Sequence, residues 1–159
     1  MNELMLFTDG SVNIQSRVGY GAYLVVAEHG LSHELLRKNV KLRRFENTSS
    51  TKLELQTLLW ALEDIQAIGH KVIAYTDSQN IIGLQGRRHR LESNNFYSKN
   101  NKRLNNFELY QEFYRMIDQL DCQLVKVRGH SSSSQKNDID RLFTLVDRGS
   151  RNALRRDGL

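Results

Sequence analysis

Two short apolar segments each end in a Thr-Asp pair that a folded chain could bring together. Asp9 follows the run Leu4–Phe7 and Asp77 follows the run Val72–Tyr75, with a serine soon after each aspartate. Short apolar runs with aromatic residues are typical of buried strands, so we expect each aspartate at the exposed end of a strand. Two such strands lying side by side would place both carboxylates at one site. Taken alone, Asp9 and its following glycine could be a turn, and Asp77 or its following serine could cap a helix.

Three further carboxylates have the spacing to join this pair. Glu54 lies in the first turn of a helix expected from about Thr51 to Ile65, on the flank of its apolar face. The pattern Thr-x-x-Glu also fits a capping box, in which the glutamate only closes the helix N-terminus. Asp140 and Asp147 are seven residues apart on a C-terminal helix. That spacing separates them by about 10 Å, so only one of them can reach the same small site.

A carboxylate cluster without a group of histidines or cysteines favours a hard divalent cation. Repulsion among the carboxylates would raise their pKa values and destabilise the fold, and Mg²⁺ or Mn²⁺ would remove that repulsion. Two such ions about 4 Å apart can activate a water on one side of a phosphodiester and stabilise the leaving oxygen on the other. The expected reaction is hydrolysis of a nucleic-acid strand, leaving a 3′ hydroxyl and a 5′ phosphate.

The positive charge of the chain is concentrated in one segment. The 159 residues carry a formal net charge of +5. Between Ser78 and Phe107 there are six basic residues and one acidic residue, Glu92, an excess equal to that of the whole chain. We expect a basic, handle-like segment at about 86–105 to contact a nucleic-acid backbone, the alternative being an ordinary solvated loop. The candidate contacts are Arg87, Arg88, Arg90, Lys99, Lys102 and Arg103.

The remaining segments predict an α/β fold, with a mixed sheet covered by helices. We expect an antiparallel meander first, with a second strand at Gly19–Ala27, a third at Leu31–Lys41 and then a polar connection at Leu42–Ser50. Strands and helices then alternate. The further strands are expected at Lys71–Thr76 and Cys122–Val127, and the further helices at Ser78–Leu84, Phe107–Met116 and Asp138–Arg155.

Composition limits the organisation and the compartment. The length suits a single domain over residues 1–159. Cys122 is the only cysteine, which excludes a disulfide within the chain and a cysteine zinc site, and fits a reducing compartment. We expect a soluble cytoplasmic protein, because the sequence shows neither a signal region nor an apolar run that could span a bilayer. We also expect a monomer, since no spare apolar stripe is evident.

Six motifs, taken in order, resemble type I ribonuclease H over nearly the whole chain. They are Phe7-Thr-Asp-Gly-Ser11, Gly19-Tyr-Gly-Ala22, Leu53-Glu-Leu55, Thr76-Asp-Ser78, Val127-Arg-Gly-His130 and Val146-Asp147. The resemblance implies a ribonuclease H-like fold with a five-stranded mixed sheet, and a metal-dependent endonuclease that cuts the RNA strand of an RNA/DNA hybrid. It places the family's first three carboxylates on Asp9, Glu54 and Asp77. The family's flexible-loop histidine, thought to assist water delivery or product release, falls on His130.

The fourth carboxylate has two candidates. We prefer Asp147, because the segment Val146–Ala153 resembles the closing helix of the family. Asp140 is the alternative, since the gap from the loop histidine to Asp147 is long.

Two departures from the family pattern affect substrate binding. The loop after the first carboxylate lacks the usual glycine-proline pattern, leaving Asn13 and Gln15 as candidates for reading the RNA 2′ hydroxyls. The residues from Ser49 to Thr51 replace the usual Thr-Asn-Asn run, so the grip on the DNA strand is expected to differ.

Two other functions fit parts of the same pattern. One is a DNA nuclease or recombination enzyme of the same fold class, against which the handle-like segment weighs. The other is a non-catalytic nucleic-acid-binding module, which would be expected to have lost one of the carboxylates. The chain keeps candidates for all four.

Overall fold

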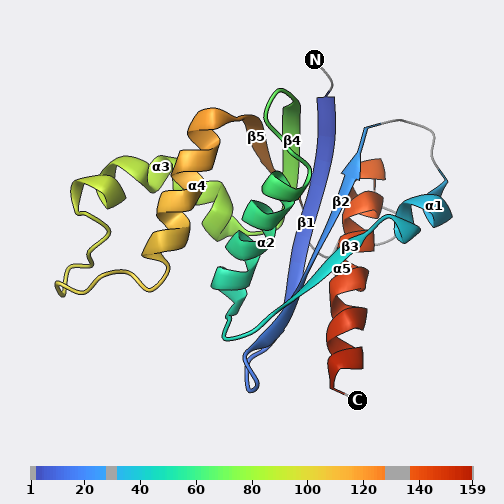
Figure 1. Ribbon diagram of the computed structural model, residues 1–159, viewed down its shortest axis with the longest axis horizontal. Helices are drawn as coiled ribbons and strands as arrows, with labels where there is room; N and C mark the ends of the chain where they lie inside the picture. The colour runs from blue at the N-terminus through green and yellow to red at the C-terminus, as the bar shows by residue number, and fades with distance from the viewer. Residues whose placement is uncertain (1–2, 28–31, 128–136, 159) are drawn as a thin grey trace.

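A five-stranded mixed sheet forms the centre of the computed structural model, which describes residues 3–27, 32–127 and 137–158. The spatial order of the strands is β3-β2-β1-β4-β5. The first three pair antiparallel, and β4 and β5 run parallel to β1 (Figure 1). The strands span β1 (Glu3–Asn13), β2 (Val18–Val26), β3 (Lys41–Phe45), β4 (Lys71–Thr76) and β5 (Asp121–Lys126). The predicted fold class is therefore confirmed.

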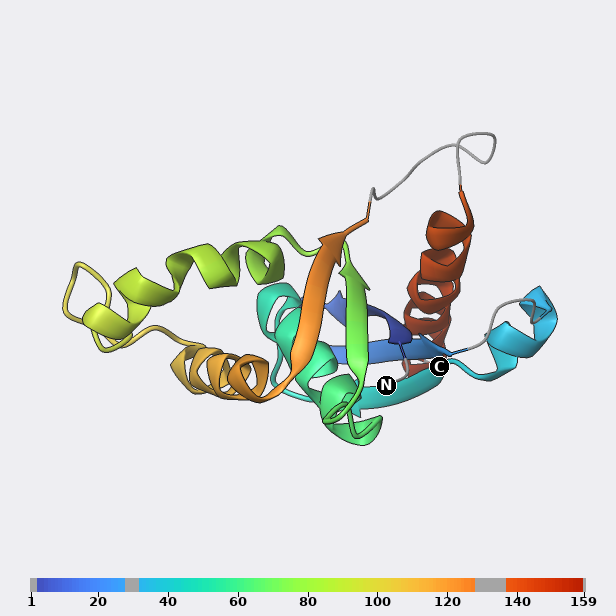
Figure 2. The same cartoon turned by 90° about the horizontal axis from the view of Figure 1, so that it is seen from above.

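Helices cover both faces of the sheet (Figures 1 and 2). One apolar core lies under α2 (Ser50–Asp64), α3 (Gln79–Ser93) and α4 (Phe107–Gln119). A second core lies on the opposite face, under α5 (Asp138–Asp157) and α1 (His33–Lys38). Side chains alternate between the two cores along β1, because successive residues of a strand point to opposite faces. None of the helices in the described ranges has the length and apolar character that crossing a membrane requires.

The strand expected at Leu31–Lys41 is wrong. Most of the described part of this segment forms the short helix α1, and the third strand begins at Lys41 and continues into the segment expected to be a connection. Ser32 starts the helix by accepting a hydrogen bond from the amide of Leu35, and charges at both helix ends match the helix dipole. The sequence did not reveal β3 because this edge strand is largely exposed and lacks an alternating apolar pattern.

The short helix expected at Ser78–Leu84 is more than doubled in length, because α3 continues to Ser93. Only a few of its residues are buried, which explains the weak periodicity of the sequence beyond Leu84. The second half of α3 and the following loop, residues 94–106, form the basic segment, which we call the handle. Arg103 fixes the end of this loop by stacking on the rings of Tyr97 and Phe107, 5.0 Å and 4.4 Å from their centroids.

Glycines on β1 and β2 allow α2 to lie unusually close to the sheet. A methyl group placed on Gly10 or Gly19 would come within 2.9 Å or 2.7 Å of the Leu53 side chain. One placed on Gly21 would be closer still to Thr57, one turn further along α2. The close contact sets the height of the first two turns of α2 above β1 and β2.

Gly21→Ala should destabilise the protein because the added methyl group overlaps Thr57 and must push α2 away from the sheet. We expect the free energy of unfolding, measured by urea denaturation, to fall by about 1–3 kcal/mol. Gly86→Ala is the matched control, since a methyl group there on α3 meets nothing within 4 Å. It should raise the free energy of unfolding by about 0.5–1 kcal/mol. Equal effects of the two substitutions would contradict the close packing of α2.

Candidate active site

Asp9 and Asp77 come from adjacent parallel strands. The expectation that Asp9 ends its strand is wrong, because β1 continues to Asn13 and Asp9 pairs with Ala22 of β2. Pairing with β4, however, ends at Phe7 and Tyr75, two residues before each aspartate. Asp9 therefore lies where β1 is no longer paired with β4, and Asp77 follows the end of β4 directly. Both carboxylates stand at one edge of the sheet.

Glu54 reaches this edge from α2 and does not close that helix. The capping-box alternative is wrong, because Ser49 is the N-cap and accepts a hydrogen bond from the amide of Lys52. Glu54 instead accepts a hydrogen bond from the hydroxyl of Ser78, which also caps α3 by accepting from the amide of Ile81. Ser78, which directly follows Asp77, thus joins Glu54 of α2 to the start of α3.

Asp147 and Asp140 occupy different environments on α5. Asp147 forms a hydrogen bond with Asp9 and an ion pair with Arg151, whose Nε lies 3.0 Å from its Oδ1. Asp140 belongs to a capping box with Asn137 and receives the backbone N–H of that residue at 3.3 Å. The structure therefore brings Asp147 to Asp9, and it shows Asp140 engaged in closing the start of α5.

An open cleft of about 350 Å³ lies between the sheet edge and α2. Asp9, Glu54 and Asp77 line it, together with Ser50 and Leu53 of α2 and residues 10–12 of β1. Its floor is tied to α5 by a hydrogen bond of 3.0 Å between the hydroxyls of Ser11 and Ser150.

The electrostatics of the cleft favour a bound proton or cation. Burial raises the pKa of Asp9 from 3.8 to about 8, with further contributions from the charge of Asp77 and from sharing a hydrogen bond with Asp147. Burial also raises the pKa of Glu54, the hydrogen bond from Ser78 lowers it, and the charge of Asp77 raises it further. Without a cation, Asp9 therefore binds a proton much more readily than an ordinary aspartate.

The donor set fits Mg²⁺ or Mn²⁺ in its chemistry. Asp9, Glu54, Asp77 and Asp147 offer hard carboxylate oxygens, and the raised pKa of Asp9 indicates that positive charge is lacking beside it. Among the described residues, no three acidic, histidine or cysteine side chains already form a group that could hold a metal ion. A cation would therefore have to draw these carboxylates closer together.

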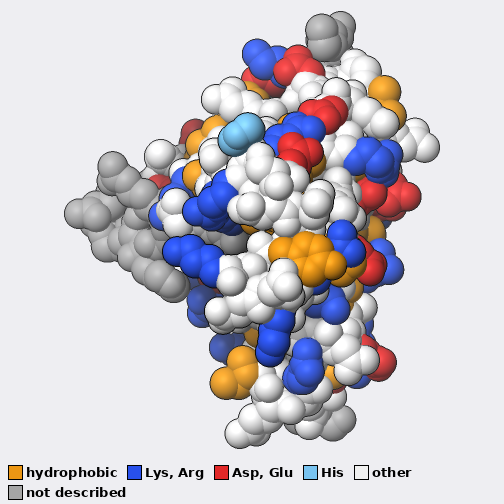
Figure 3. All heavy atoms as spheres, turned by 90° about the vertical axis from the view of Figure 1, so that its left-hand side faces the viewer, with side chains coloured by type: hydrophobic (Ala, Val, Ile, Leu, Met, Phe, Trp, Pro, Cys, Tyr) orange, Lys and Arg blue, Asp and Glu red, His pale blue; other side chains and the backbone are white. Residues whose placement is uncertain are grey.

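The basic side chains predicted to contact substrate gather on the handle. Figure 3 shows Lys and Arg side chains spread over the face made by α3, α4 and the loop between them. Arg87, Arg90 and Lys99 line a second cavity on this face, and Lys102 is exposed in the loop. Arg88 points elsewhere and binds Asp118 through both guanidinium nitrogens Nη1 and Nη2, at 2.6 and 2.7 Å.

The remaining predicted contacts lie around the cleft. Asn13 ends β1 and accepts hydrogen bonds from the amides of Gln15 and Ser16, so it closes the β1–β2 hairpin, and both it and Gln15 are exposed. Ser49 and Thr51 lie at the start of α2, where Ser50, between them, lines the cleft. His130 lies outside the described residues.

Two contacts at the site escaped the sequence analysis. They involve Ser150 and Arg151, which were expected only as parts of the helix Asp138–Arg155. A serine in a buried stripe and an arginine four residues after an aspartate are the signals that could have identified them.

The sequence of this chain is similar to those of known proteins. The family model for RNase H matches residues 1–146. The chain is 26% identical to the ribonuclease H of Caldicellulosiruptor saccharolyticus over 147 residues, covering 89% of this chain and 94% of that protein. It is 28% identical to the ribonuclease H of Orientia tsutsugamushi over 141 residues, covering 87% and 79% of the two chains.

Solved structures share the fold. The solution structure of the PFV RNase H domain superposes with a TM-score of 0.73 at 15% identity, covering 96% of this chain and 94% of that domain. A type 1 RNase H with the type 2 active-site motif gives a TM-score of 0.68 at 19% identity, covering 96% and 72%. A foamy viral protease-reverse transcriptase in complex with an RNA/DNA hybrid gives 0.67 at 15% identity, covering 94% of this chain and 20% of that one.

Asp9→Asn should stabilise the metal-free protein in a pH-dependent way. The pKa of Asp9 is raised on folding, so its contribution to stability is fully present below pH 4 and is lost as the pH rises through about 8. Asparagine does not titrate. In chelator at pH 9 we expect the variant's free energy of unfolding to exceed the wild-type value by about 1–3 kcal/mol, and this gain should vanish at pH 4.

Urea denaturation at several pH values would measure this difference. Asp121→Asn, at an exposed aspartate at the start of β5, is the control and should show no comparable gain. An equal gain from Asp9→Asn at pH 4 and pH 9 would contradict the raised pKa.

Proposed function

The chain belongs to the ribonuclease H family and is an RNase H enzyme, and we propose that it hydrolyses the RNA strand of RNA/DNA hybrids with the aid of divalent cations. The products would be a 3′ hydroxyl and a 5′ phosphate. The observation that carries the proposal is that carboxylates from β1, α2 and the end of β4 line one cleft, with Asp147 of α5 interacting with Asp9 beside it. Mg²⁺ is the expected cation, with Mn²⁺ as the alternative, and two ions are proposed.

Asp9, Glu54, Asp77 and Asp147 are the residues proposed to hold the cations. When bound, these ions would supply an activated water and stabilise the charge on the leaving oxygen. The chain's own groups hold the carboxylates in place: Ser78 donates to Glu54, and the amide of Gly10 donates to Asp9. Positive charge entering the cleft would lower the pKa of Asp9 and favour its ionised form.

The RNA/DNA hybrid is proposed to cross the cleft and reach the handle. The net charge of the handle supports this path, as does the fold shared with a reverse transcriptase that was solved with an RNA/DNA hybrid. Asn13 and Gln15 on the β1–β2 hairpin would read RNA 2′ hydroxyls, and Ser49 and Thr51 would contact the other strand. His130 would assist water delivery or product release, as the resemblance implies. We propose that a single domain acts as a monomer in the cytoplasm.

The substrate would be tested with one labelled sequence prepared as RNA/DNA hybrid, double-stranded RNA, double-stranded DNA and single-stranded RNA. Each would be incubated with Mg²⁺, Mn²⁺ or chelator. We expect cleavage of the RNA strand of the hybrid alone, and only with a cation. Cleavage of DNA would favour a recombination nuclease. Binding of the hybrid without any cleavage would mean that the protein is a non-catalytic binding module.

Asp9→Asn and Asp77→Asn should each reduce hybrid cleavage at least about 100-fold, because several kcal/mol of transition-state stabilisation depend on the cations. Binding of the hybrid in chelator should persist or strengthen, since one negative charge facing the phosphates is removed. Gel-based cleavage rates and fluorescence anisotropy would measure the two properties. Full cleavage activity in either variant would contradict the proposed metal centre.

A paired substitution would decide between the two candidates for the fourth carboxylate. Asp147→Asn should impair cleavage at least about tenfold, because this side chain contacts Asp9 and would lose its charge. Asp140→Asn keeps an oxygen that can accept from the amide of Asn137, so its cleavage rate should stay within about twofold of wild type. The reverse order of effects would make Asp140 the fourth ligand.

A further inference from the structure

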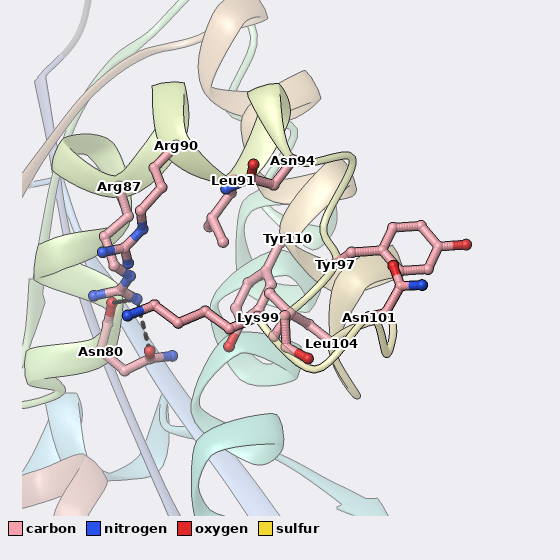
Figure 4. A pocket seen from close by; sticks show the side chains of 11 residues that line it. Asn80, Arg87, Arg90, Leu91, Asn94, Tyr97, Lys99, Asn101, Leu104 and Tyr110 are labelled. Carbon is pink, nitrogen blue, oxygen red and sulfur yellow. Dashed lines mark hydrogen bonds between the residues drawn. The ribbon is translucent and has the colours of Figure 1, made fainter.

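The handle contains a cavity of about 600 Å³, separate from the cleft, between α3, the loop and the start of α4 (Figure 4). Its apolar floor is made by Leu91 and Leu104, with Tyr110 beside them. Three cationic side chains, Arg87, Arg90 and Lys99, line it, and no carboxylate is found among the described residues that do so. The cavity therefore concentrates positive charge without an internal counter-charge.

The three cationic side chains of the cavity lie close together although no carboxylate in the described ranges neutralises them. In Figure 4 the guanidinium groups of Arg87 and Arg90 lie beside each other, and the side chain of Lys99 extends toward them. Within the described part of the chain, none of the three forms an ion pair. Arg88, next in the sequence, binds both Asp118 and Glu92. The structure thus neutralises the arginine on one flank of α3 and leaves the cavity-facing cations without a carboxylate.

Asn80 adds a hydrogen-bond donor that lacks an acceptor. Nη2 of Arg87 donates to both the backbone oxygen and Oδ1 of Asn80, at 3.1 and 2.8 Å. A guanidinium can only donate, so this contact fixes which end of the amide faces Arg87. The Nδ2 group, at the opposite end, is buried and has no hydrogen-bond partner. A buried donor without an acceptor is costly, and an anion's oxygen would satisfy it.

We propose that Asn80, Arg87, Arg90 and Lys99 form a discrete phosphate-binding site. A phosphate group offers several acceptor oxygens in a tetrahedral arrangement, which matches a cluster of cations plus one neutral donor. Asn80 follows Asp77 by three residues in the first turn of α3, so the site begins about one turn from the cleft. Identifying the phosphate as part of a nucleic-acid strand rests on the proposed function.

Binding of the bare anion tests the site directly. Inorganic phosphate would be titrated into ¹⁵N-labelled protein while NMR follows the side-chain amide of Asn80. We expect a saturable shift of this resonance, and no such shift with chloride at equal ionic strength. Arg90→Ala should weaken the response. An Asn80 amide that does not respond to phosphate would overturn the proposal.

Substitutions test whether the hybrid uses the site. Asn80→Asp keeps the oxygen that Arg87 contacts, so it preserves folding while removing the donor and adding repulsion. In chelator we expect at least about tenfold weaker binding of a blunt RNA/DNA hybrid. Asn80→Ala removes the donor without adding charge and should weaken binding by a smaller factor. Arg90→Ala should weaken binding and reduce the slope of log affinity against log salt by about 1.

Arg37→Ala is the charge-matched control, because Arg37 is exposed on α1, on the opposite side of the molecule (Figure 2). If the Asn80 and Arg90 variants bind the hybrid as tightly as this control does, the site has no role in holding the hybrid.

Modified hybrids distinguish the sources of the phosphate. Hybrids with a 5′ hydroxyl or a 5′ phosphate separate a terminal group from the backbone, and neutral methylphosphonate linkages in one strand or the other identify the strand. The loss of affinity caused by Asn80→Asp should disappear only with the hybrid in which the contacted phosphate is absent or neutral. If wild-type protein binds phosphate but cleaves no hybrid, the phosphate site stands and the proposed function fails. If it cleaves the hybrid but the Asn80 amide does not respond to phosphate, the proposed function stands and the phosphate site fails.

Discussion

Repulsion among carboxylates at one edge of the sheet is the constraint around which this fold is arranged. Asp9 and Asp77 are brought together by parallel strands whose pairing stops two residues earlier, and the stacked rings of Phe7 and Tyr75 occupy the last pair, 4.9 Å apart. Packing of these two rings therefore favours the close approach of β1 and β4, which repulsion between Asp9 and Asp77 opposes. Such an arrangement is stable only with a proton or a cation between the carboxylates, which is why the pKa of Asp9 is raised.

The rest of the structure holds the other two carboxylates against that repulsion. Glycines on β1 and β2 let α2 approach the sheet closely enough for Glu54 to share a hydrogen bond with Ser78. On the opposite face, Ser150 of α5 bonds to Ser11 of β1 and also donates to the backbone oxygen of Asp147, at 3.1 Å. Each helix is thus fixed to the sheet within one turn of the carboxylate that it carries.

The sequence allowed the fold class to be predicted, because strand and helix patterns alternate after an antiparallel start and six motifs in order resemble the family. It could not separate Glu54 from a helix cap, since the pattern Thr-x-x-Glu serves both and only the position of Ser49 decides. The edge strand β3 was missed because exposure on both faces removes the alternation that identifies strands. Asn80 was missed because its significance depends on its contact with Arg87, two turns further along the same face of α3, and on the burial of Nδ2, neither of which a linear pattern reveals.

The last turn of α5 connects a distant part of the molecule to the cleft. Tyr20 of β2 and Arg44 of β3 both donate to the same oxygen of Asp157, each at 2.7 Å. These contacts help to hold α5 along its own axis, and Asp147 lies ten residues earlier on that helix. Sliding the helix by one residue would move Asp147 by about 1.5 Å, whereas metal ligands must be placed to within about 0.2 Å. The exposed contacts of Asp157 therefore add to the Ser11–Ser150 hydrogen bond in setting where α5 carries Asp147. Substitutions at Tyr20, Arg44 or Asp157 would then act on the proposed fourth carboxylate without touching it.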